Sequence, residues 1–245
     1  MMTETKLRLD QQECCCCIPP TTMPGIELGK RRRYYTPAEV ALHNCAEDCW
    51  VSIFNQVYDL TELIAKNRGP LAQPLVQAAG GDISHWFDET TRDVRSHVDE
   101  ETGLELPYLP MGRFLHVPPP EPSSSWRTDF SPWWRDETTC IGRLSEKTRS
   151  VEIVNVLSQQ TDVLLVCSEE TLDEIQDRYL EHNAHARSYT WKSLQSGEFV
   201  PLDMKKTLAE NDVPDESEEF ERLSINDDYY TPTLHVYYND DLTVA

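Results

Sequence analysis

Histidines near aromatic rings are the residues of this sequence best suited to hold a cofactor. His85 follows the glycine pair Gly80–Gly81 and directly precedes Trp86 and Phe87, and His97 lies further along the chain. Imidazole nitrogens can ligate haem iron, and aromatic rings pack well against a flat macrocycle. His85 and His97 are therefore candidate ligands, although His85 could instead pack beside Trp86 and His97 could face solvent. No hydrolase triad, nucleotide-binding loop or zinc-protease spacing is recognisable.

The cysteines offer a second, weaker set of candidates. The four consecutive cysteines Cys14–Cys17 could be acylated, with the basic run Lys30–Arg33 as a second membrane signal. They could also contribute to a metal site, or be a chance feature of a variable tail. Cys45 and Cys49 are the nearest further thiols, but they complete no recognised zinc motif.

Composition restricts the class of partner. The 22 Lys and Arg residues against 43 Asp and Glu give a formal net charge of −21 at pH 7, whereas nucleic-acid phosphates require clustered Lys and Arg. No stretch is long and apolar enough to span a bilayer, and the first residues are too polar for a secretory signal. We therefore expect no nucleic-acid partner, no membrane span, a cytoplasmic or cytoskeletal location, and reduced thiols.

The elements that must position His85 predict an α+β domain over residues 34–117, after a disordered tail at 1–33. Thr36–Glu39 is a capping box with proline at the first helical position. Strands at 49–54 and 57–60 flank a turn at Asn55–Gln56. Asp59 and Asp82 each precede a further helical segment, and a closing strand is expected at 113–117.

A proline-rich stretch predicts the boundary between two domains. Residues 118–140 begin with prolines and serines, a composition typical of an extended, semi-rigid linker. The same stretch carries Trp126, Phe130, Trp133 and Trp134. Such large rings are expected to leave water, either by covering the edge of a core or strapping the two domains together, or by docking a partner.

Residues 141–245 predict a second α+β domain. Strands at 151–157 and 163–167 are joined by a polar turn, and a capping box at Thr171–Glu174 begins an amphipathic helix. Further strands are expected at 189–192 and 234–238. A small sheet packed on one helix is the economical way to bury these apolar faces.

The first domain resembles the cytochrome b5 family. The resemblance rests on four motifs in order, at 35–44, 48–52, 57–61 and 79–82, the last followed by Phe87. It implies a pocket for haem b, with Tyr58 and Phe87 as candidate lining residues.

The sequence departs from the family at the iron ligands. Asn67-Arg68-Gly69-Pro70 stands where the family has His-Pro-Gly-Gly, and the place of the second axial histidine falls near Arg92. The resemblance therefore leaves His85 and His97 as the candidate axial ligands of haem iron, with a non-histidine donor or no haem as the alternatives.

The second domain resembles ubiquitin-like β-grasp domains, although the chain ends without a Gly-Gly tail. The two domains in this order, joined by a Trp-rich segment, resemble a family of proteins of motile cilia. That resemblance implies a protein of the cytoskeleton and ciliary axoneme that is associated with radial spoke proteins and needed for coordinated beating. Because the b5 scaffold is kept while His-Pro-Gly-Gly is lost, we expect a non-enzymatic protein whose b5-type domain binds haem and senses redox state. The alternative is a soluble b5-type electron carrier for a reductase or oxygenase.

Overall fold

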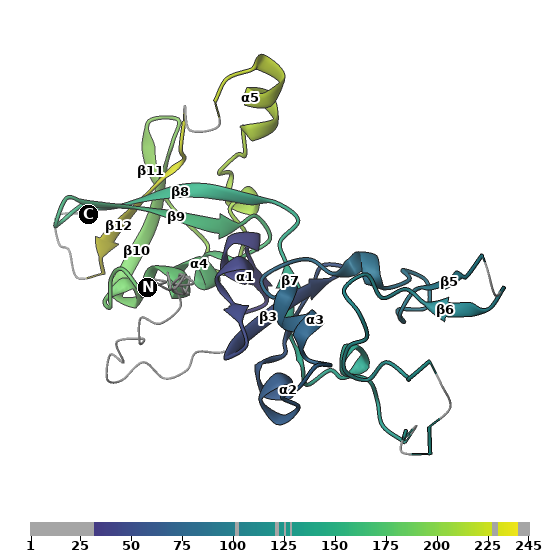
Figure 1. Cartoon of the computed structure of the whole chain (residues 1–245). Helices are drawn as coiled ribbons and strands as arrows, with labels where there is room; N and C mark the ends of the chain where they lie inside the picture. Colours follow the sequence, from purple (N-terminus) through teal and green to yellow (C-terminus); the bar gives the residue numbers. More distant parts are fainter. Residues whose placement is uncertain are drawn as a thin grey trace, which may run out of the picture. The chain divides into compact units, whose positions relative to one another are not determined.

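Two five-stranded sheets and a two-stranded hairpin organise the part of the chain that the structure describes (Figure 1). The computed structural model describes residues 32–100, 103–120, 123–124, 126–127, 129–226 and 230–239. From Arg32 onward these residues fall in one unit. The candidate acylation site Cys14–Cys17 and nearly all of the predicted tail lie outside the described residues.

The first sheet has the strand order β1-β7-β4-β3-β2. Its strands are β1 (Tyr34–Tyr35), β2 (Asn44–Cys45), β3 (Asp48–Ile53), β4 (Gln56–Asp59) and β7 (Cys140–Leu144). The β3–β4 hairpin turns at Phe54 and Asn55, whose φ angles of 47° and 62° are left-handed, as tight hairpin turns require. The turn therefore lies one residue earlier than the predicted Asn55–Gln56.

Short helices and a hairpin accompany this sheet. They are α1 (Pro37–Leu42), α2 (Thr61–Lys66), α3 (Gln73–Gln77), a 3₁₀ helix (Ser84–Trp86) and the strands β5 (Ser96–Val98) and β6 (Glu105–Pro107). The predicted capping box of α1 is confirmed: Thr36 and Glu39 each accept a backbone N–H from the other, at 3.1 and 2.8 Å. The side chains of Ile64, Leu75 and Trp86, one from each of α2, α3 and the 3₁₀ helix, are buried in the first core.

The strand predicted at 113–117 is wrong. Phe114, Leu115 and Val117 are buried, but the backbone turns there, because His116 has a φ of 70° and the Val117 N–H donates to the Phe114 carbonyl at 3.2 Å. An apolar run of this length does not distinguish a strand from a buried turn.

The segment predicted as a linker enters the first core. A 3₁₀ helix (Trp133–Arg135) buries Trp133 and Trp134 among the apolar side chains of that core. Strand β7 follows and pairs antiparallel with β4 and parallel with β1. Residues 133–144 therefore complete the first sheet, beyond the predicted domain end at 117 and across the predicted start of the second domain at 141. The physical reason is that Trp133 and Trp134 cover the apolar core and β7 pairs with the edge of β4.

The second sheet has the order β11-β10-β12-β8-β9, with β12 parallel to β8 and the remaining pairs antiparallel (Figure 1). Its strands are β8 (Thr148–Asn155), β9 (Gln160–Cys167), β10 (Tyr189–Gln195), β11 (Glu198–Pro201) and β12 (Thr233–Tyr238). Helix α4 (Leu172–Tyr179) contributes Leu172, Ile175 and Tyr179 to its core. The predicted α+β class is confirmed, whereas β11 and α5 (Ser217–Leu223) were not predicted.

A buried ion cluster joins α1 to α4. Arg178, whose side chain is 7% exposed, donates through Nε to both carboxylate oxygens of Glu170 at 2.9 and 2.8 Å and through a terminal nitrogen to Glu39. Burial lowers the pKa of Arg178, but the bonds to the two carboxylates outweigh burial and raise it. Helix α1, which precedes β7 in the sequence, is therefore connected to α4, which follows β7, by paired charges, of which Arg178 and Glu170 are buried.

Within the residues that the structure describes, no helix has both the length and the apolar character needed to cross a membrane.

Candidate cofactor site

The positions that should carry axial histidines hold side chains with other partners. Asn67 ends α2 and is exposed, and its side-chain amide donates to the Leu63 carbonyl at 2.9 Å. Arg92 adopts a left-handed φ of 57°, and its guanidinium lies 4.5 Å from the centre of the Phe54 ring. This cation–π contact engages Arg92 with a half-buried ring that packs against the first core. Neither side chain is an iron ligand of the kind that haem proteins use.

The two predicted ligands lie on different elements and face outward. His85 is exposed in the 3₁₀ helix Ser84–Trp86, with its ring edge-on to Trp86 at 6.1 Å. His97 is exposed in β5, with its ring edge-on to Tyr108 at 6.4 Å. Their assignment as ligands remains a prediction, and the structure does not place either ring in the buried core.

His85 does line an open groove beside the glycine pair. The groove has a volume of about 480 Å³ and is also lined by Gly80, Gly81, Trp86 and Met111. Gly80 needs its left-handed φ of 77° there, and a Cβ would lie 3.0 Å from that of Asn44, so the motif residue shapes this wall.

Phe87, a predicted pocket residue, packs against protein rings. Its side chain is 1% exposed, and its ring centre lies 6.1 Å from Trp133, 5.7 Å from Trp134 and 6.3 Å from Phe114. These distances are typical of aromatic pairs in cores. Aromatic side chains therefore occupy the space beside Phe87 where the resemblance predicted a cofactor.

Tyr58, the other predicted pocket residue, is also engaged by protein. Its ring lies edge-on to Trp133 at 6.0 Å, and its hydroxyl donates to Gln56 Oε1 at 2.8 Å. Burial raises the pKa of Tyr58. A neutral phenol that donates to an amide is not poised to become a tyrosinate ligand.

Polar contacts fix the two tryptophans in place. The Trp134 indole and the Arg135 guanidinium both donate to Asp93, each at 2.9 Å, and the Trp133 backbone N–H donates to His116 Nδ1 at 3.0 Å. His116 must be neutral to accept this bond, and burial lowers its pKa. The sequence prediction did not identify Asp93 or His116. The sequence signal that pointed to this region was the run of aromatic residues after the prolines, which predicted buried rings but not their polar partners.

The buried thiol of Cys49 is not available as a metal ligand. Burial raises the pKa of Cys49 to about 12, and its Sγ donates to the Leu75 carbonyl, so Cys49 remains a protonated thiol. Among the described residues, no group of three or more His, Cys, Asp and Glu side chains is placed to hold a metal ion.

The residues of this site do not fit haem b held between two histidines. Such a site needs donor side chains directed into an apolar cavity. Here Asn67 stands at the first family position and Arg92 near the second, the candidate ligands His85 and His97 are exposed, and the core beside Phe87 is filled with rings.

The sheet, the short helices and the Ala-Gly-Gly-Asp loop define a b5-type domain that is completed by later residues of the chain. Residues 36–110 match the family described as "Cytochrome b5-like Heme/Steroid binding domain", so the predicted resemblance is confirmed. The chain belongs to the family of cytochrome b5 domain-containing protein 1. It is 53% identical over 215 residues to that protein of Xenopus laevis, covering 87% of this chain and 97% of the relative.

Other relatives separate the whole-chain match from the domain match. Cytochrome b5 domain-containing protein 1 of Homo sapiens is 51% identical over 215 residues, covering 87% of this chain and 92% of the relative. Cytochrome b5 of Nicotiana tabacum is 33% identical over 75 residues, covering 30% of this chain and 54% of that protein. The similarity to cytochrome b5 domain-containing protein 1 therefore covers most of the chain, whereas the similarity to tobacco cytochrome b5 covers 30% of it.

Proposed function

We propose that this protein is a non-enzymatic docking protein whose b5-type domain acts as a scaffold rather than as a bis-histidine haem carrier. The packing of Trp133 and Trp134 against Phe87 is the observation that carries the proposal. These rings make the interior a continuous core, and such cores tolerate little added volume. The absence of iron ligands from the two family positions is consistent with this role.

We further propose that the second sheet is a ubiquitin-like β-grasp module. The support is its topology: two antiparallel hairpins, β8–β9 and β10–β11, flank β12, which runs parallel to β8. Helix α4 follows the first hairpin and packs on the sheet. Modules of this kind function through their surfaces rather than through an internal active site.

The proposed location is the axoneme of motile cilia, with radial spoke proteins as partners and coordinated beating as the process served. The support is the resemblance drawn from the order of the two domains. Fluorescence microscopy of the tagged full chain in ciliated cells, together with proximity labelling, tests both parts. Uniform cytoplasmic signal and no enrichment of spoke proteins would reject the location and the partners.

The scaffold role is tested by adding haem to the purified full chain. We expect no saturable Soret band at one haem per chain while circular dichroism shows a folded protein. A tobacco cytochrome b5 preparation provides the positive control, because its name identifies it as a cytochrome. A saturable one-to-one band in the full chain would reject the scaffold role.

A haem-binding redox sensor is the second candidate, favoured by the groove that His85 lines beside Trp86. In that case His85→Ala or His97→Ala should shift or remove the Soret band. His182→Ala is the matched control, because His182 is also largely exposed but lies after α4. The site gives no further support to a soluble electron carrier, since neither family ligand position holds a histidine.

A further inference from the structure

A buried arginine that has no anionic partner among the described residues lies in a groove of the second sheet. Arg149 in β8 is 9% exposed, and its two terminal nitrogens both donate to one backbone carbonyl, that of Val213, at 3.2 and 3.3 Å. Its Nε has no acceptor within the described part of the chain. A desolvated cation without a counter-charge is costly, and buried charges in native proteins are normally paired.

Asp215, whose charge acts on Arg149, has other partners. Asp215 accepts the Lys147 ammonium at 3.0 Å and the Ser217 backbone N–H and hydroxyl at 3.1 and 2.7 Å. It makes no ion pair with Arg149, although its charge acts on that residue from a distance. Burial is the main cause that lowers the pKa of Arg149, and Asp215 only partly offsets it.

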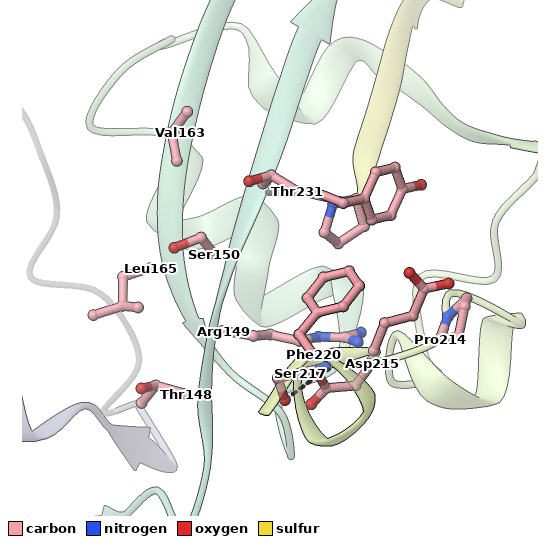
Figure 2. Close-up of a pocket in the computed structure, with 13 residues that line it drawn as sticks. Thr148, Arg149, Ser150, Val163, Leu165, Pro214, Asp215, Ser217, Phe220 and Thr231 are labelled. Atoms are coloured by element: carbon pink, nitrogen blue, oxygen red, sulfur yellow. Dashed lines mark hydrogen bonds between the residues drawn. The ribbon is translucent and has the colours of Figure 1, made fainter. Parts of the chain in front are cut away.

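The groove beside Arg149 combines this cation with apolar walls. It has a volume of about 390 Å³, and Figure 2 shows Arg149 extending from β8 toward Phe220, Pro214 and Asp215. Apolar and aromatic side chains line it: Pro214, Phe220 and Pro232, with Tyr230, which is 53% exposed. Val163 and Leu165 also border the groove but lie on the outer face of β9, because their partners on β8 are Glu152 and Ser150 rather than Arg149. Ser150 and Thr231 add hydroxyl groups to the lining.

We infer that this groove binds a peptide segment of a partner in which an Asp or Glu side chain is flanked by apolar residues. The carboxylate would accept from Arg149, and the flanking side chains would pack against Phe220 and Tyr230, which also line the groove. A carboxylate fits better than a phosphate, because Asp215 and Glu216 also line the groove and repel each added negative charge. The inference rests on the proposed docking role and names a partner chemistry for it.

The test uses the full chain and three capped peptides, Gly-Leu-X-Leu-Gly with X as Asp, Asn or phosphoserine. Nuclear magnetic resonance follows the side-chain Nε–H signals of the arginines, with the Arg149 signal assigned from its loss in Arg149→Met. We expect the Asp peptide to shift this signal saturably and the Asn peptide to leave it in place. An unmoved signal, an equal response to Asn, or tighter binding of the phosphoserine peptide would overturn the inference.

Variants separate recognition from structural support. Arg149→Met should weaken binding of the Asp peptide about tenfold or more, and Tyr230→Ser should weaken it about threefold through lost apolar contact. Arg187→Met is the matched control, because Arg187 is a surface arginine paired with Asp177, and it should leave the affinity unchanged.

The melting temperature of the free protein distinguishes a binding role of Arg149 from a purely structural one, because the two roles predict changes of opposite sign in Arg149→Met. Arg149→Met should raise it, because the variant removes an uncompensated buried charge. A lower melting temperature with unchanged peptide affinity would assign Arg149 to structure alone and overturn the inference. Failure of peptide binding would leave the haem titration unaffected, so the inference and the scaffold role can fail separately.

Discussion

Removing Arg178 should destabilise the whole described unit, because this side chain pairs with carboxylates from two regions of the chain. Glu170 is 1% exposed, and apart from Arg178 its carboxylate accepts the Cys167 N–H at 3.0 Å. Arg178→Met keeps most of the apolar stem and leaves the Glu170 charge buried with that single backbone donor. Glu39 on α1 loses the same guanidinium.

The magnitude follows from the burial of the pair. Breaking a buried ion pair by removing one member costs about 3–5 kcal/mol, because the other charge stays desolvated. For a protein of this size, about 1 kcal/mol lowers the melting temperature by about 2–4 °C. We therefore expect Arg178→Met to melt about 6–20 °C below the parent chain.

Urea unfolding followed by tryptophan fluorescence, with thermal unfolding by circular dichroism, measures the loss. Arg187→Met is the control, because Arg187 pairs with Asp177 at 2.9 Å but its side chain is 69% exposed, and exposed pairs contribute about 1 kcal/mol or less. Adding Glu170→Gln to Arg178→Met should recover part of the stability, since a neutral amide costs less to bury than a carboxylate. A loss in Arg178→Met no larger than in the control would refute the reasoning.

Two further predictions concern the segment that closes the first core. The fold lowers the pKa of His116, so its neutral form contributes stability that is complete above the ordinary pKa of about 6.5 and is lost as the pH falls below it. Urea midpoints should therefore fall more between pH 7.5 and 5.5 in the parent chain than in His116→Asn, which keeps an acceptor; equal slopes would contradict this. Trp133→Ala should cost about 3–5 kcal/mol in unfolding free energy, because Trp133 is 1% exposed. The half-buried Trp126 is the control, and a similar loss in Trp126→Ala would count against a specific role for Trp133.

Signals confined to a few neighbouring residues predicted local structure well. The capping boxes at Thr36 and Thr171 form as expected, because each depends on a Glu only three residues away. The alternating apolar residues of β8 and β12 likewise predicted strands of the second sheet. By contrast, β11, whose residues are all exposed, carried no such pattern.

Contacts between distant parts of the sequence could not be predicted in the same way. Proline and serine after residue 117 indicate an extended chain, but they do not reveal that Trp133 packs against Tyr58 or that β7 pairs with β4. The position of His85 next to Trp86 in the sequence also could not show that the His85 ring faces solvent while Trp86 is buried. That Arg149 lacks a carboxylate partner among the described residues is a property of three-dimensional packing, and Arg149 lies outside the predicted strand at 151–157.

Strand β7 has a consequence for how this protein can be divided. The match to the b5 family ends at residue 110, yet the sheet and core of that domain are completed by Trp133, Trp134 and β7. A fragment cut at the family boundary would expose the ring of Phe87 and the edge of β4, and hydrophobic molecules added to it could bind there nonspecifically. Haem binding should therefore be measured on a chain that extends at least through Leu144, where the last strand of the first sheet ends.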